Sequence, residues 1–264
     1  MPELPEVELC RLELEDWCVG HTIVAVNALD GWPLARGTKA ADLEALVGQT
    51  VLAVERVGKQ MALTTSGPCL LVHLGMTGHF ERGGDAKTRV SWVLDDGQRI
   101  ALVDPRRFGK LSLAPAPDWG ELGPDALKVA GRRGGLFRCV GTAKGPIKVV
   151  LMDQARIAGV GNIYASEACW DAGVHPARPA RSLGPEVMDR IGKSLVKSMR
   201  RTLRQGMKDP DFKYLVDGGV NAFWVYGREG LPCHRCHTAI NRVVQAGRST
   251  YFCRQCQPRG NKRS

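Results

Sequence analysis

The sequence lacks the features that would direct a chain into a membrane or out of the cell. None of its 264 residues belong to an apolar run near the roughly 20 residues that a membrane span needs. Its first residues are acidic where a secretory signal peptide would carry basic ones. Its nine cysteines are an odd number, and the five before residue 230 stand singly, which argues against a disulfide framework. We therefore expect a cytoplasmic protein with reduced thiols.

Charge is abundant and unevenly distributed along the chain. The formal net charge is +10, and such an excess opposes compact folding unless a polyanionic partner offsets it. The segment Arg228–Ser264 is strongly basic, whereas Met1–Asp16 is strongly acidic. The acidic segment must either face away from an anionic partner or have a chemical role beside it.

The first half of the chain is predicted to contain one helix followed by antiparallel β-structure. Apolar residues recur at helical spacing between Glu6 and Trp17. Many short β-type runs without long intervening helices follow, which is typical of an antiparallel sandwich or barrel. These runs are His21–Ala28, Thr50–Val57, Gln60–Thr65, Cys69–Leu74, Arg89–Leu94, Arg99–Val103 and Lys110–Leu113.

The second half is predicted to be helical and then to return to short β-segments around four cysteines. A proline-rich stretch, Ala114–Pro124, separates the two halves. Helical patterns cover Val149–Ile157, Ile163–Ala172 and Pro185–Arg204. We expect an N-terminal domain at 1–115, a linker at 116–135, a helical domain at 136–222 and a terminal β-ribbon at 223–264.

Four cysteines near the C-terminus form the strongest single motif. Cys233-x2-Cys236 and Cys253-x2-Cys256 are separated by sixteen residues, a spacing typical of a four-cysteine zinc site. Because the segment has few apolar residues, one zinc ion would hold it folded. With no open coordination position evident, the zinc is expected to be structural. A redox pair or a chance cluster is the alternative.

The first six residues, Met1-Pro2-Glu3-Leu4-Pro5-Glu6, offer a reactive amine. Removal of Met1 is expected because the next residue is small, and it leaves Pro2 as a terminal amine with a pKa of about 8. The positive end of a helix dipole would favour its uncharged, nucleophilic form. Glu3 and Glu6 are candidate proton carriers beside it. The simpler alternative is that proline and glutamate merely begin a helix.

Two glycine-bounded turns in the β-region carry bulky side chains. Met76 lies in His73-Leu-Gly-Met-Thr-Gly78, and Arg106 and Phe108 lie in Asp104-Pro-Arg-Arg-Phe-Gly109. Such side chains can fill the gap left by a base that is turned out of DNA. The alternative is that Met76 and Phe108 belong to the core.

Other residues are candidates for contacts with phosphate groups. The glycine-rich turn at 157–161 joins two predicted helices and offers backbone N–H groups to an anion. Lys148 precedes this turn and Asn162 follows it. Arg248 lies in the cysteine-rich ribbon, where it could contact phosphates. Lys59, at a predicted turn, could contact a phosphate or transfer protons, although most exposed turn lysines have no such role.

Taken together, these motifs resemble the bacterial formamidopyrimidine-DNA glycosylases of the wider endonuclease VIII superfamily. The resemblance spans essentially the whole chain. It implies an α+β multidomain fold, with an N-terminal helix and antiparallel β-sandwich, a helix–two-turn–helix domain and a C-terminal zinc ribbon. The shared segments, in order, are Pro2–Glu8, Val57–Lys59, His73–Gly78, Asp104–Gly109, Leu151–Tyr164 and the four-cysteine ribbon.

The resemblance also implies an activity. The enzyme would remove oxidised purines, such as 8-oxoguanine and formamidopyrimidines, from double-stranded damaged DNA during base-excision repair. An N-terminal proline would attack C1′ of the damaged nucleotide, and β,δ-elimination from the Schiff base would cut the strand. One structural zinc ion and no redox or organic cofactor would be needed. The enzyme would act as a monomer at the bacterial nucleoid, without contact with a membrane.

The resemblance assigns roles residue by residue. Pro2 would be the nucleophile and Glu3 the principal acid and base, while Glu6 would stabilise the site and Lys59 would assist at the phosphate and in elimination. Met76, Arg106 and Phe108 would fill the space of the extruded base. Lys148, Asn162 and Arg248 would bind the DNA backbone around the lesion. The zinc ligands would be Cys233, Cys236, Cys253 and Cys256.

Two departures from the family pattern concern the substrate. Gln205–Tyr214 lacks the Gly-Gly-Thr-type motif of the lesion-capping loop, and Lys87–Val90 replaces a more usual His-Asp-His-Val. One alternative is therefore an endonuclease VIII-like glycosylase for oxidised pyrimidines or another lesion. A second is a zinc-ribbon protein that binds damaged DNA without cutting it. The catalytic and void-filling motifs favour the formamidopyrimidine branch.

Overall fold

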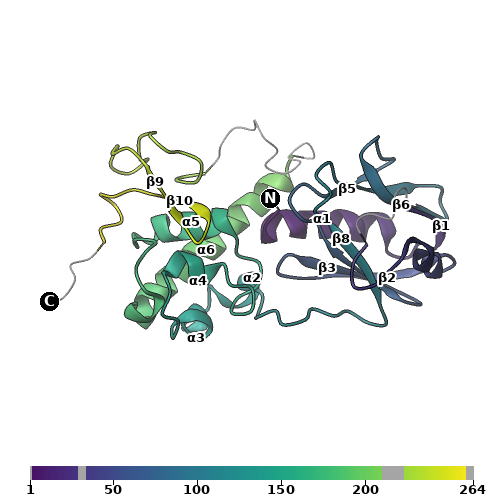
Figure 1. Cartoon of the computed structure of the whole chain (residues 1–264), viewed down its shortest axis with the longest axis horizontal. Helices are drawn as coiled ribbons and strands as arrows, with labels where there is room; N and C mark the ends of the chain where they lie inside the picture. Colours follow the sequence, from purple (N-terminus) through teal and green to yellow (C-terminus); the bar gives the residue numbers. More distant parts are fainter. Residues whose placement is uncertain (1, 29–33, 210–222, 260–264) are drawn as a thin grey trace. The chain divides into compact units, whose positions relative to one another are not determined.

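The structure is a computed structural model that describes residues 2–28, 34–209 and 223–259 (Figure 1). The chain divides into two compact units. The first contains Met1–Gly120 and Gly206–Asp217, and the second contains Glu121–Gln205 and Gly218–Ser264. No helix among the described residues is long and apolar enough to cross a membrane.

The first unit opens with helix α1 (Leu4–Cys18). The backbone N–H of Glu3 donates to the carboxylate of Glu6 at 2.9 Å, which fixes the entry into the helix. Pro5 lies in the first turn, where a missing N–H costs no helical hydrogen bond. The predicted helix is confirmed and begins two residues earlier than the periodicity indicated.

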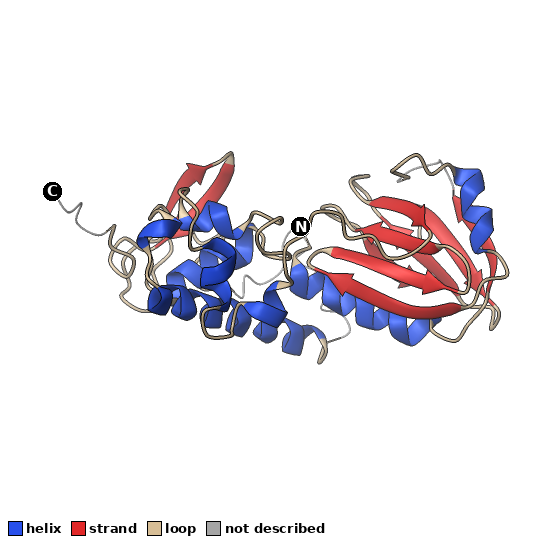
Figure 2. Cartoon of the chain, turned by 90° about the horizontal axis from the view of Figure 1, so that it is seen from below, coloured by secondary structure: helices blue, strands red, loops and turns tan. Residues whose placement is uncertain are grey.

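Two four-stranded antiparallel sheets follow, in the orders β1-β6-β7-β5 and β2-β3-β4-β8. Figure 2 shows these strands in red with α1 running alongside them in blue. The predicted β-sandwich is thereby confirmed. The strands are β1 (Ile23–Ala28), β2 (Val51–Val57), β3 (Gln60–Thr65), β4 (Cys69–His73), β5 (His79–Arg82), β6 (Thr88–Leu94), β7 (Arg99–Val103) and β8 (Lys110–Ala114), with a short helix η1 (Ala40–Leu46) after β1.

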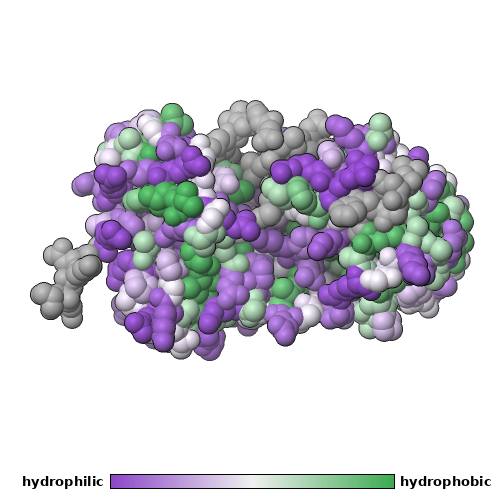
Figure 3. Space-filling view, in the orientation of Figure 1, coloured by the Kyte–Doolittle hydropathy of each residue, from purple (hydrophilic) through white to green (hydrophobic). Residues whose placement is uncertain are grey.

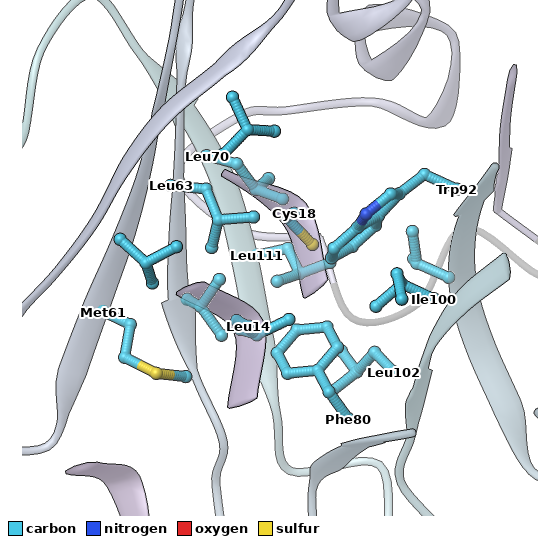
Figure 4. Close-up of a cluster of buried hydrophobic side chains, with 14 of the residues drawn as sticks. Leu14, Cys18, Met61, Leu63, Leu70, Phe80, Trp92, Ile100, Leu102 and Leu111 are labelled. Carbon is cyan, nitrogen blue, oxygen red and sulfur yellow. The ribbon is translucent and has the colours of Figure 1, made fainter. Parts of the chain in front are cut away.

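The core of the first unit is shared by α1 and both sheets (Figure 4). Leu14 of α1 lies among Met61 and Leu63 of one sheet and Trp92 and Ile100 of the other. All five side chains are at most 1% exposed. Because burying each such side chain stabilises a fold by about 1.5–3 kcal/mol, this core fixes α1 on the sandwich.

The second unit is helical and ends in a β-hairpin. Its predicted linker, 116–135, contains one short helix, and a second short helix begins at the last residue of the linker, Gly135. The helices are α2 (Ala126–Val129), α3 (Gly135–Val140), α4 (Ile147–Leu151), α5 (Asn162–Asp171), η2 (Ala180–Ser182) and α6 (Pro185–Gly206), and the hairpin pairs β9 (Asn241–Gln245) with β10 (Arg248–Phe252). Hydrophilic residues cover much of the surface that Figure 3 shows.

Helix α4 ends at Leu151, six residues before the end that the sequence pattern predicts. The side chain of Gln154 causes this difference. Its amide donates to the carbonyls of Met152 and Val160 and accepts the N–H of Gly159. These side-chain bonds replace the backbone bonds that a further turn of helix would make, so the helix ends here. The glycine-rich segment then leads directly into α5.

Candidate functional site

The start of α1 buries two carboxylates beside Pro2. Glu3 is 1% exposed and Glu6 is 2% exposed, and Pro2 itself is buried. Pro2 precedes the helix by two residues, at the positive end of its dipole. The hydrogen bond from the Glu3 N–H to Glu6 holds the backbone that carries Pro2 in place. Once Met1 is removed, the arrangement would place a chain-terminal amine beside acids that are shielded from water.

Lys59 lies in the two-residue turn between β2 and β3. The first turn residue, Gly58, has φ of +59°, a conformation that glycine adopts without strain. Arg56 donates to the Gly58 carbonyl at 2.9 Å and to the carboxylate of Glu8 at 2.5 Å. Its side chain is only 6% exposed. Through Arg56, α1 and the turn that carries Lys59 are held together.

His73 connects the Lys59 turn with the turn that carries Met76. Burial lowers the pKa of His73, and the nearby charges of Lys59 and Lys110 lower it further. The imidazole is therefore neutral at pH 7, and its Nδ1 accepts the backbone N–H of Gly75 at 3.1 Å. The start of the Met76 turn is thus fixed by a neutral histidine.

The two glycine-bounded turns predicted to reach into DNA lie against each other. Gly75 has φ of +65°, and a Cβ there would lie 2.3 Å from the carbonyl carbon of Phe108. The buried carboxylate of Asp104 joins the turns, since it accepts the Thr77 hydroxyl at 2.6 Å and the Gly109 N–H at 2.7 Å. One carboxylate therefore sets the geometry of both turns.

Met76, Arg106 and Phe108 all project from these turns. Met76 is 36% exposed and Phe108 is 48% exposed, so neither belongs to the core. The Arg106 guanidinium lies over the Phe108 ring, with its carbon 5.1 Å from the ring centroid. Arg107, between them, has φ of +58°, which is a strained conformation for this residue. The turn accordingly presents an aromatic ring and a cation together at the surface.

Two of the three residues predicted to bind the DNA backbone are bonded to each other in the second unit, and one of these contacts the chain neighbour of the third. Lys148 of α4 is buried and donates to the side-chain oxygen of Asn162, the first residue of α5. The Asn162 amide donates to the carbonyl of Ser249 at 2.9 Å. Ser249 follows Arg248 in β10. A chain of hydrogen bonds therefore links the two helix positions to the ribbon.

The four predicted zinc ligands converge on one point. All four sulfur atoms lie within 4.8 Å of one another. A zinc ion about 2.3 Å from each of four thiolates places neighbouring sulfurs about 3.8 Å apart. The observed Sγ–Sγ distances are 3.8 Å for Cys233–Cys256 and 3.4 Å for both Cys236–Cys253 and Cys236–Cys256. The cluster fits one structural zinc ion, as predicted.

A stack of aromatic and cationic side chains holds the zinc cluster against the helices. Trp170 of α5 donates its indole N–H to the sulfur of Cys233 at 3.4 Å. Its ring stacks on Trp224, with 5.8 Å between the ring centroids. Arg235 covers the outer face of Trp170 at 4.1 Å, and Arg201 of α6 lies 4.9 Å from the Trp224 centroid. No sequence motif indicated this stack, because its members are far apart in the chain.

A buried carboxylate fixes the segment that follows the undescribed residues 210–222. Glu167 of α5 is 1% exposed and accepts the backbone N–H groups of Trp224, Val225 and Tyr226 at 2.8–3.0 Å. Burial raises its pKa, whereas these three bonds lower it. No sequence motif indicated this role. Residues 210–214 of the Gln205–Tyr214 segment, where the lesion-capping motif is absent, lie outside the described residues.

The other segment that departs from the family pattern contacts the Asp104 turn. The Lys87 carbonyl accepts the Asp104 N–H at 3.2 Å, and Arg89 donates to the Asp104 carbonyl at 3.0 Å. The change at 87–90 therefore lies beside the turn that carries Arg106 and Phe108.

Three family models match successive parts of the chain. The formamidopyrimidine-DNA glycosylase N-terminal domain matches residues 1–111, and the H2TH domain of the same glycosylase matches residues 122–212. A zinc finger found in FPG and IleRS matches residues 230–259. The three matches agree with the helix-and-sandwich unit, the helical segment and the four-cysteine ribbon.

Relatives match over nearly the whole chain. The formamidopyrimidine-DNA glycosylase of Thermus thermophilus is 39% identical over 273 residues, which cover 98% of this chain and 100% of the relative. The enzyme of Corynebacterium aurimucosum is 37% identical and covers 98% and 97%, respectively.

Solved structures match equally well. The crystal structure of the MutM (Fpg) protein of Thermus thermophilus has a TM-score of 0.83 at 37% identity and covers 98% of this chain and all of that one. A structure of MutM in complex with DNA containing carbocyclic 8-oxo-G has a TM-score of 0.83 at 28% identity, covering 97% and 100%. The resemblance seen in the motifs is thus confirmed, and the chain belongs to the formamidopyrimidine-DNA glycosylase family.

Proposed function

We propose that Pro2 is the nucleophile with which this chain excises oxidised purines from duplex DNA. Membership of the family makes the chain a bifunctional DNA glycosylase and AP lyase. We assign each chemical step to residues of this chain. The observation that carries it is the burial of Glu3 and Glu6 around a proline that removal of Met1 makes terminal.

The reaction begins with attack of the Pro2 nitrogen on C1′. The C1′–N bond to the base breaks, and the base leaves with a proton. The C1′–O4′ bond of the sugar ring then breaks, O4′ takes up the proton that the Pro2 nitrogen gives up, and a positively charged iminium joins the opened sugar to the protein. Glu3, next to the nitrogen, transfers the protons of this step. The iminium withdraws electrons and acidifies the C2′ proton. Its removal expels the 3′-phosphate, and a second elimination expels the 5′-phosphate.

Lys59 and Glu6 support these steps in the proposal. Lys59 approaches the phosphate that leaves and assists the eliminations. Glu6 holds the Glu3 backbone through a 2.9 Å hydrogen bond and so keeps Pro2 in position. Arg56 and Glu8 act as positioning residues, because their ion pair fixes the Lys59 turn relative to α1.

Attack at C1′ requires the damaged nucleotide outside the base stack. We assign Met76, Arg106 and Phe108 to the space that this nucleotide leaves. Their exposure and their common support by Asp104 fit such an insertion. Lys148, Asn162 and Arg248 are assigned to backbone phosphates around the lesion. The buried Lys148 holds the side chain of Asn162, which in turn donates to Ser249, the residue after Arg248, so the three positions are linked.

We also propose where and in what form the enzyme acts. It acts as a monomer on damaged duplex DNA in the bacterial cytoplasm. Its division into a catalytic domain at 1–115, a linker at 116–135, a DNA-binding helical domain at 136–222 and a zinc ribbon at 223–264 stays a prediction. A panel of duplexes with single lesions tests the substrate. Cleavage of duplexes with oxidised purines should exceed that of oxidised pyrimidines, and the reverse order would contradict the assignment.

A form that keeps one extra residue before Pro2 tests the role of the amine. Its peptide nitrogen is not nucleophilic, so we expect complete loss of excision on a duplex with 8-oxoguanine. Zinc content and affinity for an abasic-site duplex should stay within about twofold of the processed protein, since neither depends on the amine. Excision at the normal rate by the extended form would rule out Pro2 as the nucleophile.

A further inference from the structure

A groove lined by cations lies in the second unit between α2 and α6. Figure 1 labels both helices. Its volume is about 500 Å³. Among the described residues that line it, none is acidic. The five cations are Lys128 and Arg132 on one wall and Lys193, Lys197 and Arg200 on the other.

The walls of the groove are fixed by close backbone packing. A Cβ at Gly192 of α6 would lie 2.0 Å from the carbonyl oxygen of Ala130, directly after α2. A Cβ at Gly131 would lie 3.3 Å from the Val196 side chain. The end of α2 therefore sits against α6 at a distance that only glycine allows. The packing of the two helices therefore fixes the shape of the groove.

The charges on α6 follow a pattern that suits an extended anion. Its acidic residues, Glu186 and Asp189, lie near its N-terminus, where their negative charges interact favourably with the helix dipole. Every charged residue of α6 after Asp189 is basic. Lys193, Lys197 and Arg200 recur at four- and three-residue steps, and so form one stripe. Like charges in such a stripe repel one another, and a bound anionic ligand would reduce this repulsion.

The groove is separate from the residues assigned to the lesion. Lys197 contacts Asp171, the last residue of α5, at 3.3 Å. Asn162 is the first residue of that helix, about 14 Å away along its axis. Asp171 also accepts Arg235 at 2.8 Å, so its one charge is shared between two cations. The groove therefore lies towards the opposite end of α5 from Asn162.

We propose that this groove is a second, lesion-independent binding site for the phosphodiester backbone of DNA. From Lys193 to Arg200 the helix rises about 10 Å, and one DNA strand carries about three phosphates over that length. Exposed lysine and arginine side chains bind such phosphates without reading the sequence. The site holds either the flank of the duplex under repair or a second duplex.

A triple substitution tests the proposal. Arg132→Gln, Lys193→Gln and Arg200→Gln remove three exposed cations and leave Lys197 with Asp171. The matched control, Lys39→Gln with Arg138→Gln and Arg181→Gln, removes three exposed cations outside the groove. Similar melting temperatures of the groove variant and the control variant show that both proteins are folded.

Two binding measurements distinguish the sources of the phosphates. On a long undamaged duplex, the plot of log affinity against log salt should flatten by about 2.7 in slope, equivalent to about a 40-fold smaller loss of affinity between 50 and 200 mM salt. This result alone indicates the flank of the same duplex. The second measurement uses two short duplexes that carry different fluorescent labels. If the wild type binds both at once and the groove variant does not, the site holds a second duplex.

The proposal fails if the groove variant matches the control in both measurements. That outcome includes the case in which the groove binds only an acidic protein segment. Excision from a short lesion duplex should be unchanged in the groove variant. A failure of the excision chemistry is therefore seen separately from a failure of this second site.

Discussion

At the scale of the residue, Asp104 decides the geometry of the two turns that carry Met76 and Phe108. Its buried carboxylate accepts hydrogen bonds from Thr77 and Gly109, which lie in different turns. The sequence motif Asp104–Gly109 drew attention to Arg106 and Phe108 but assigned no role to Asp104 itself. Its role follows only from the meeting of two segments that are 27 positions apart.

Substitution of Asp104 should destabilise the first unit in a defined order. Asp104→Ala leaves the Gly109 N–H without its buried acceptor and should lower the free energy of unfolding by about 3 kcal/mol. Asp104→Asn keeps an acceptor for Gly109 and a donor for Thr77, so it should cost about 1 kcal/mol. Urea denaturation of both variants measures the difference. Equal losses, or a larger loss for asparagine, would contradict this role.

At the scale of the element, His21 ties the start of β1 to the turn between β6 and β7. Its Nδ1 lies 2.7 Å from a carboxylate oxygen of Asp95. This hydrogen bond raises the pKa of His21 and lowers that of Asp95. The stabilisation by this pair is complete at pH values between the pKa values of the two groups in the unfolded chain, about 4 for Asp and about 6.5 for His.

The stabilisation should disappear as the pH rises through the raised pKa of His21, and as it falls through the lowered pKa of Asp95. His21→Gln should therefore lower the melting temperature most near about pH 5.5, and hardly at about pH 9. Thermal melts of wild type and variant across this range provide the measurement. A loss that does not change with pH would show that the histidine acts by packing alone.

Helix α5 supports the zinc ribbon through Trp170. Trp170→Phe removes the N–H that bonds Cys233 and keeps an aromatic ring in the stack. Loss of such a bond to a metal ligand should weaken zinc binding about tenfold. Competition with a chelator measures this, and Trp224→Phe is the matched control because it changes the stack but not the bond. Equal zinc affinities of the two variants would refute the role of the N–H.

Most elements were predictable from the sequence because their patterns are local. Seven of the eight strands of the sandwich match predicted runs to within a few residues. The missed strand, β5, has four residues between two turns and depends on its pairing with β7. The short helices α2 and α3 were also missed, since four to six residues give too little periodicity.

The candidate site was predictable where a motif carried it. The motifs contained Pro2, the bulky turn residues and the cysteines. Arg56 and Trp170 were missed because their partners, Glu8 and Cys233, are 48 and 63 residues away. Such contacts exist only once the fold has formed.

At the scale of the whole molecule, the chain consists of two compact units, of which only the second contains the zinc cluster. Removal of zinc should therefore unfold the ribbon and leave the first unit intact. For Cys236→Ser, we expect loss of bound zinc, weaker DNA binding and an unchanged melting transition of the first unit. Circular dichroism and DNA titration test both parts. Full DNA affinity without zinc would contradict the prediction.

At the scale of the whole molecule, DNA repair chemistry explains both the basic net charge and the acidic first residues of the chain. The cations of the second unit suit a phosphate backbone, and the buried acids at the start of α1 suit proton transfer beside a terminal amine. The central claim is accordingly chemical. Pro2 should form a covalent bond to the sugar of the damaged nucleotide.

Borohydride reduction during the reaction tests this claim most directly. Reduction traps the iminium as a stable amine, and mass spectrometry of the digested adduct identifies the residue attached to the sugar. We predict that with an 8-oxoguanine duplex the sugar remnant is attached to the N-terminal peptide, at the nitrogen of Pro2. A remnant attached to Lys59 or another lysine, or cleavage of the duplex without any trapped adduct, would contradict the account.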